Sequence, residues 1–146
     1  MNEVSVRALR PADADAARAL VSAQFAGTRY EARLLEQLEL AIRGDDPECQ
    51  ALITDDAHGL VLFGSIAGAT GVVKIHALAG DVSVLHALAC EVRATGARLV
   101  MCELADDAPF AVTDRLLREL GFEEAGRVAD FFRDGIALVI LAWRSL

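Results

Sequence analysis

The chain has 146 residues, of which 54% are hydrophobic, and its 14 basic and 22 acidic side chains give a formal net charge of −8. This length predicts a single domain, over residues 1–146, that can bury a substantial core. The acidic balance and the single lysine, Lys74, argue against nucleic-acid binding, because contacts to phosphates need clustered lysine and arginine.

The sequence has no segment that predicts membrane insertion or secretion. No apolar run approaches the roughly 20 residues of a membrane span, and residues 1–10 lack the basic start and apolar block of a secretory signal. The three cysteines, Cys49, Cys90 and Cys102, are widely spaced and form no C-x-x-C pair. We therefore expect a reduced, cytoplasmic protein that does not enter a membrane.

Hydrophobic periodicity predicts alternating strands and helices. Residues 4–9 alternate apolar and polar side chains, as a strand does, and Pro11 suits the first turn of a helix that continues to about Gln24. The further predicted elements, in chain order, are a helix over 31–42, strands over 50–54, 60–65 and 72–78, a helix over 82–95, a strand over 98–104, a helix over 106–120, and strands over 127–132 and 136–144.

This order, β-α-α-β-β-β-α-β-α-β-β, predicts the fold class. Strands that alternate with helices in the second half indicate a mixed sheet covered by helices. We expect an α/β (α+β) domain with a central sheet of about seven strands flanked by four helices.

Short motifs along the whole chain support one family resemblance. Residues 6–13, VRALRPAD, resemble the opening IRPATPAD, and Phe63-Gly64 with Thr70-Gly71 resembles the turn YGP-x-x-x-T-x-G. Residues 96–100 resemble the passage from the central helix into the next strand, 120–122 resembles LGF, and 129–135 resembles PDFY-x-x-G. In this order and spacing, the motifs resemble those of the GNAT superfamily of N-acetyltransferases.

The resemblance implies a way of working. In that family two neighbouring strands, here 72–78 and 98–104, splay apart, and the pantetheine arm of acetyl-CoA pairs with the backbone of the first. The pyrophosphate lies on N–H groups of a Q/R-x-x-G-x-G/A loop at the start of the central helix. A base takes a proton from the substrate amine, and a tyrosine on the last helix often protonates the leaving thiolate. The implied function is acetyl transfer from acetyl-CoA to a small amine.

The implied cofactor positions lie at the end of one strand and the start of the next helix. They are His76, Ala77, Leu78, Gly80, Asp81, Val82 and Ser83. This loop departs from the family, because residues 79–83 contain one glycine and no basic side chain. Asp81 is placed to cap the helix, where its carboxylate would occupy N–H groups that a phosphate needs. Leu117 stands where the family usually has its tyrosine, and leucine cannot donate a proton.

Three side chains could take part in chemistry. His76 shares one face of its strand with Lys74 and could act as the base, or it could be a histidine half-buried on the sheet. Cys102 could be a nucleophile close to the acyl site, or a small core residue. Tyr30, the single tyrosine, suits packing or the rim of a substrate site better than catalysis.

No metal site is predicted. His86 and Cys90 lie four residues apart on a helix and could face each other, but two ligands do not make a zinc site. The pairs Asp45-Asp46, Asp55-Asp56 and Asp106-Asp107 fall in predicted turns, where carboxylates usually cap backbone groups. Asp106 or Asp107 could also line the mouth of an amine site.

Two functions remain open at this stage. One is an N-acetyltransferase for a small amine, and the acidic surface would suit a cationic substrate. The other is a degenerate GNAT fold that acts as a binding or regulatory module, as a homodimer. The apolar strand at 136–141 could support such a dimer if its edge is exposed.

Overall fold

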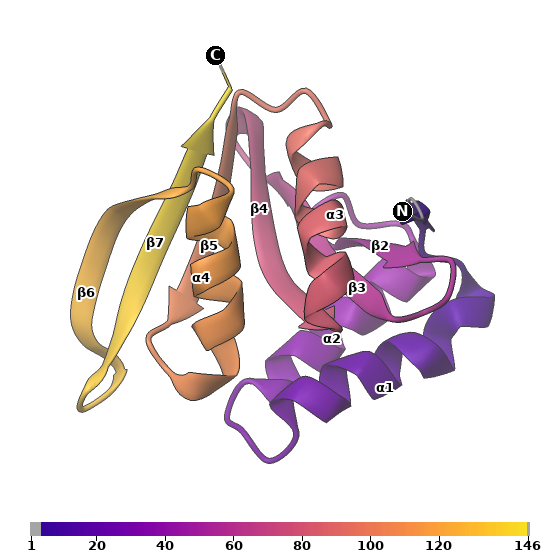
Figure 1. The fold of residues 1–146 in the computed structure, drawn as a ribbon, viewed down its shortest axis with the longest axis horizontal. Helices are drawn as coiled ribbons and strands as arrows, with labels where there is room; N and C mark the ends of the chain where they lie inside the picture. The colour runs from indigo at the N-terminus through magenta and orange to yellow at the C-terminus, as the bar shows by residue number, and fades with distance from the viewer. Residues whose placement is uncertain (1–3, 146) are drawn as a thin grey trace.

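The computed structural model describes residues 4–145 (Figure 1). The first half contains β1 (Val6–Ala8), the short 3-10 helix η1 (Pro11–Asp13), α1 (Ala14–Phe25), α2 (Glu31–Arg43), β2 (Gln50–Thr54), β3 (Gly59–Ile66) and β4 (Ala69–Gly80). The second half contains α3 (Val82–Arg93), β5 (Leu99–Ala105), the 3-10 helix η2 (Ala108–Phe110), α4 (Ala111–Glu119), β6 (Glu123–Arg133) and β7 (Ile136–Arg144).

The strands form one mixed sheet, as the order of elements predicts. Within residues 4–145 it has seven strands in the order β1-β2-β3-β4-β5-β7-β6. Neighbours are antiparallel except β4 and β5, which are parallel. Their pairing runs only from Val72 opposite Leu99 to Ile75 opposite Cys102. Beyond Ile75 the two strands separate, and this places an unpaired edge of β4 inside the domain.

The helices cover the sheet through the apolar stripes that their sequences predict. The helix α1 buries Ala17, Val21 and Phe25, and α2 buries Leu34, Leu38 and Ala41. Figure 1 shows α3 and α4 side by side over one face of the sheet. Gly44 ends α2 with φ 74° and its N–H bonds the carbonyl of Leu40, which is the left-handed cap expected there.

Several predicted boundaries move by a few residues. The strand expected at 127–132 is β6, Glu123–Arg133, which is longer because it pairs along nearly the whole of β7. The helix expected from 106 begins instead as η2, where the Asp107 side chain caps the N–H of Ala108, and α4 starts at Ala111.

The strand proposed as a dimer edge lies inside the sheet. β7 is flanked by β5 and β6, so the backbone of 136–141 is already paired on both sides. The condition for a dimer through this strand is therefore not met, and β6 is the outer strand instead. No helix among residues 4–145 is both long and apolar enough to cross a membrane.

Candidate functional site

A β-bulge lies where β4 leaves β5. Ile75 pairs with Phe63 and Ala77 pairs with Leu62, so His76 is an extra residue in β4 with no partner of its own in β3. A bulge bends the strand and redirects one side chain. Here it coincides with the end of the β4–β5 pairing and turns His76 toward the open end of the sheet.

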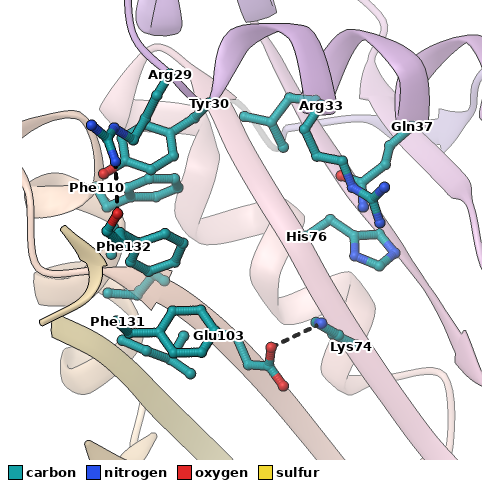
Figure 2. Close-up of a pocket in the computed structure, with 14 residues that line it drawn as sticks. Arg29, Tyr30, Arg33, Gln37, Lys74, His76, Glu103, Phe110, Phe131 and Phe132 are labelled. Atoms are coloured by element: carbon teal, nitrogen blue, oxygen red, sulfur yellow. Dashed lines mark hydrogen bonds and ion pairs between the residues drawn. The ribbon is translucent and has the colours of Figure 1, made fainter. Parts of the chain in front are cut away.

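A pocket of about 340 Å³ opens at this end, between α2, β4, β5 and the β6–β7 hairpin (Figure 2). Its polar lining consists of Arg29, Arg33, Gln37, Lys74, His76 and Glu103. Its aromatic lining consists of Tyr30, Phe110, Phe131 and Phe132. Figure 2 shows the rings of Tyr30, Phe110 and Phe132 on one side of the pocket, with Arg33 and His76 on the opposite side.

His76 is held in one tautomer. Its Nε2 lies 2.7 Å from the carbonyl oxygen of Glu48, which can only accept, so Nε2 carries the proton and Nδ1 the lone pair. Gly64 permits this contact, because a Cβ there would overlap the Glu48 carbonyl group. Burial lowers the pKa of His76 below its usual value, with smaller contributions from Lys74 and Arg33. The imidazole is therefore neutral around pH 7.

Lys74 and His76 share one face of β4, as strand alternation predicts, and both line the pocket. The Lys74 Nζ lies 3.2 Å from a carboxylate oxygen of Glu103, which comes from β5 across the gap. Sequence patterns did not point to Glu103 or Arg33, because single charged residues on a strand and a helix look like ordinary surface.

A second irregularity builds the aromatic wall. β6 and β7 pair at Val128–Leu138 and again at Arg133–Ile136, so the residues between bulge out of β6. Asp130 takes a positive φ of 55° in this bulge, and its carboxylate accepts the Gly135 N–H at 2.7 Å. The bulge carries Phe131 and Phe132 to the pocket, where their rings meet edge to face at 5.0 Å.

Tyr30 is a packing residue that also borders the pocket. It is 9% exposed and meets Phe110 and Phe132 edge to face. Its hydroxyl donates to Asp107 at 2.8 Å, and burial with this bond raises the pKa of Tyr30 to about 12. The phenol therefore stays protonated at physiological pH. Asp107 is engaged by Tyr30, and neither it nor Asp106, which binds Arg127, lines this pocket.

The free edge of β4 is covered by a side chain from α1. The Asp81 N–H bonds the His58 carbonyl, so Leu78 and Gly80 direct their backbone groups away from β3. The Gln24 amide nitrogen donates to the Leu78 carbonyl at 2.9 Å, and its oxygen accepts the Gly80 N–H at 3.1 Å. One primary amide thus bonds the Leu78 carbonyl and the Gly80 N–H in the way that a neighbouring strand would.

The start of α3 is capped from within. The Asp81 carboxylate accepts the backbone N–H of Ser83 at 3.0 Å and the Ser83 hydroxyl at 2.9 Å. Its own carbonyl accepts the N–H of Val84. These bonds hold the pKa of Asp81 below its usual value, so the residue is a fixed negative charge at the helix N-terminus. The predicted cap is confirmed.

Comparison with solved structures identifies the fold. An acetyltransferase of the GNAT family from Desulfovibrio desulfuricans has a TM-score of 0.82 and 24% identity, with 97% of this chain and 99% of that chain covered. The Escherichia coli ribosomal-protein-S18-alanine N-acetyltransferase has a TM-score of 0.70 and 14% identity, with 97% and 94% covered. The chain has the GNAT fold. No family model and no curated protein matches its sequence.

A third similar structure bears on the cofactor. An acetyltransferase from Salmonella typhimurium, whose structure includes its cofactor acetyl-CoA, has a TM-score of 0.69 and 17% identity, with 98% of this chain and 94% of that chain covered. The GNAT resemblance places the pantetheine arm on the β4 backbone and the pyrophosphate at the start of the central helix. In this chain Gln24 bonds the Leu78 carbonyl and the Gly80 N–H, and Asp81 bonds the Ser83 N–H. A cofactor bound on this edge would have to displace these three bonds.

The side chains at the other positions singled out by the GNAT resemblance differ in burial. Leu117, which stands in place of a tyrosine, is fully buried in α4. Ala77 and Leu78 are buried in β4, whereas the side chain of Val82 is largely exposed at the start of α3. Cys102 is buried in β5, and burial raises the pKa of its thiol to about 12, which opposes a nucleophilic role.

The remaining candidates behave as local caps or pairs. The Cys90 sulfur lies 3.7 Å from His86 Nδ1, so these residues do face each other on α3. Within residues 4–145 no three histidine, cysteine or acidic side chains gather as metal ligands would. Asp46 accepts the Glu48 N–H, and Asp56 accepts from Thr54 and His58, which confirms their predicted roles in turns.

Proposed function

We propose that this GNAT-fold domain binds a small molecule in the pocket beside His76 and does not transfer acetyl groups from acetyl-CoA. It would then act as a binding or regulatory module. The observation that carries this proposal is the pair of hydrogen bonds from Gln24 to Leu78 and Gly80. They satisfy the edge of β4 that the GNAT resemblance assigns to the cofactor, so a bound pantetheine would first have to displace them.

Two further features support the same conclusion. The Asp81 carboxylate places a negative charge on the N-terminus of α3, where it both bonds an N–H group and repels a phosphate. Leu117 has no proton to give to a leaving thiolate. Asp81 thus opposes phosphate binding, and Leu117 removes the usual proton donor. Together these two residues leave the fold without the usual means to hold or activate acetyl-CoA.

The pocket, by contrast, has the features of a ligand site. Its volume of about 340 Å³ falls within the roughly 300–1,000 Å³ that is typical of small-molecule sites. Aromatic side chains line it together with a small number of polar groups. The bulge in β4 places His76 there, and the bulge in β6 places Phe131 and Phe132. A domain that has lost cofactor binding can therefore still recognise a small molecule.

Acetyl transfer to a small amine is the second candidate. The separation of β4 from β5 after Ile75 favours it, as does the acetyl-CoA in the similar Salmonella typhimurium structure. His76 could then accept a proton at Nδ1. This function would need Gln24 to leave the β4 edge, and a cofactor site formed by His76 to Leu78 and Gly80 to Ser83 remains a prediction. Cytoplasmic location and a homodimer also stay predictions.

A turnover assay separates the two candidates. The purified protein is incubated with acetyl-CoA and a panel of small amines, and release of free CoA thiol is followed. We expect no release above the rate without protein, both for the native chain and for His76→Gln. Amine-dependent release that His76→Gln abolishes would overturn the proposal in favour of acetyl transfer.

A further inference from the structure

We propose that the pocket beside His76 takes an aromatic monocarboxylate anion, with its ring against Phe131 and Phe132 and its carboxylate toward Arg33 and Lys74. This inference rests on the proposed function, because it assumes that the pocket binds a small molecule. It runs against the cationic amine that the acidic composition of the whole chain suggests.

The apolar end of the pocket presents ring surface that the protein itself does not cover. Phe131 is 57% exposed, although it is one of the largest apolar side chains in the domain. The β6 bulge, with Asp130 at a φ of 55°, holds it at the pocket rather than in the core. Phe132 and Tyr30 continue the wall through an edge-to-face contact with ring centroids 5.8 Å apart. A flat aromatic ligand would add one more ring to this cluster.

The opposite end holds an arginine whose charged group has no partner among the described residues. Of the three cations that line the pocket, Arg29 donates to the Phe132 carbonyl at the aromatic end, whereas Arg33 and Lys74 lie at the opposite end with Glu103. Glu103 is already paired with Lys74 at 3.2 Å. The Arg33 side chain makes no hydrogen bond or ion pair with any residue in the described range 4–145. Figure 2 shows its guanidinium group extending toward His76, which is neutral and adds no compensating charge.

The acidic residues near Arg33 do not bond its guanidinium group, because their carboxylates are directed to other groups. Asp46 accepts the backbone N–H of Glu48, and the Glu48 carboxylate accepts the N–H of Ala67. Both line an adjoining cavity, as does Glu36, and Arg33 and Lys74 lie on the boundary between that cavity and this pocket. A carboxylate ligand could therefore pair with the free guanidinium group of Arg33. The planar guanidinium group can donate two parallel hydrogen bonds to a carboxylate, and such pairs are strong.

The arrangement also disfavours an amine. A ligand ammonium group would have to share Glu103 with Lys74 and would lie close to Arg33, and like charges in one site repel. The pocket thus selects by charge as well as by shape, and an anion should bind more tightly than a neutral or cationic molecule of the same size.

Three probes of almost equal size test this selection. Phenylacetate, phenylacetamide and phenethylamine are titrated into the isotope-labelled protein, and backbone amide shifts are followed by nuclear magnetic resonance. We expect saturable shifts around Arg33, Lys74 and Phe131, with phenylacetate binding most tightly and phenethylamine most weakly. Equal affinities, stronger binding of phenethylamine, or no saturable binding of phenylacetate at this pocket would each overturn the proposal.

Matched variants identify the groups responsible. Arg33→Gln should weaken phenylacetate about fivefold and leave phenylacetamide unchanged, since one exposed charge-assisted bond is lost. Arg43→Gln makes the same charge change at the far end of α2 and should alter neither affinity. Phe131→Ala should weaken both ligands. An unchanged phenylacetate affinity in Arg33→Gln would show that the carboxylate does not lie there.

The ligand class and the proposed function fail in different ways. Acetyl-CoA turnover would contradict the proposed function whatever the three probes do. Loss of charge selection among the probes, with acetyl-CoA inactive, would contradict the ligand class alone.

Discussion

Gln24 and Gly80 are joined by a hydrogen bond of 3.1 Å from the Gly80 N–H to the side-chain oxygen of Gln24. The same amide donates to the Leu78 carbonyl at 2.9 Å. A helix side chain thus completes the hydrogen bonding of a strand at the place where its neighbouring strand departs. This relationship explains how β4 and β5 can separate inside the domain without leaving these two backbone groups unpaired.

Removal of the Gln24 amide should destabilise the domain. Gln24→Ala leaves the Leu78 carbonyl and the Gly80 N–H without their partner, and we expect a loss of about 1–2 kcal/mol in the free energy of unfolding. Urea unfolding followed by circular dichroism measures this. Gln37→Ala, at a half-buried position on α2, is the control and should change stability by less than about 0.5 kcal/mol. Equal stabilities of the two variants would contradict the role given to Gln24.

Glu124 should stabilise the fold in a pH-dependent way. Bonds from Arg127 and Arg118 lower the pKa of Glu124 to about 2 in the folded protein. Because the folded pKa lies below the unfolded value, the contribution is present above the unfolded pKa and is lost as pH falls toward 2. The Tm of Glu124→Gln should therefore lie below that of the native chain at pH 6, and the difference should shrink toward pH 2. Glu123→Gln, at the neighbouring exposed position, is the control.

His76 should also make the native fold less stable as pH falls, but in a higher pH range than Glu124. Burial lowers its pKa in the folded protein, so the unfolded chain binds a proton that the folded chain refuses. This lowers the stability of the native chain as pH falls through about 6.5, the unperturbed histidine value. In His76→Gln that part of the decrease should disappear. Thermal unfolding of both proteins between pH 7.5 and pH 5, roughly the range over which histidine titrates, measures this. An identical decrease in both proteins would contradict a buried neutral His76.

Thiol labelling should distinguish the cysteines. Cys102 is buried and its raised pKa, about 12, keeps it protonated, whereas Cys90 is partly exposed on α3. We expect a thiol reagent at pH 8, roughly the unperturbed cysteine pKa, to modify Cys90 quickly and Cys102 only on unfolding. Cys90→Ser should remove the fast phase, and peptide mapping identifies the modified residue. Fast modification of Cys102 in the native protein would contradict its place in the core and reopen a nucleophilic role.

The fold could be predicted from local patterns because they agree with the tertiary structure. The stripe Val84, Leu85, Leu88 and Val92 faces the core in α3 as its spacing predicts. Asp81 was identifiable as a cap because N-caps depend on a residue type at one local position. The start of β6 was predicted less accurately, since its pairing with β7 decides that boundary and no local pattern encodes the pairing.

The site was harder to predict, because its parts meet only in three dimensions. Gln24 lies on the α1 stripe between buried residues, where a polar side chain needs a hydrogen-bond partner. The sequence does not indicate that its partners are the backbone groups of Leu78 and Gly80. Arg33 gains significance only from its position beside His76 in the folded chain. The bulge that brings Phe131 to the pocket depends on a register shift between β6 and β7.

Calorimetric titration with acetyl-CoA, with free CoA as the comparison, shows whether the edge of β4 and the start of α3 can hold the cofactor. The native protein and Gln24→Ala are titrated side by side at low salt, where any phosphate contact is strongest. We expect no saturable heat for the native protein with either ligand, because Gln24 and Asp81 bond backbone groups that a cofactor would use. Binding of acetyl-CoA in the micromolar range by the native protein would contradict this expectation.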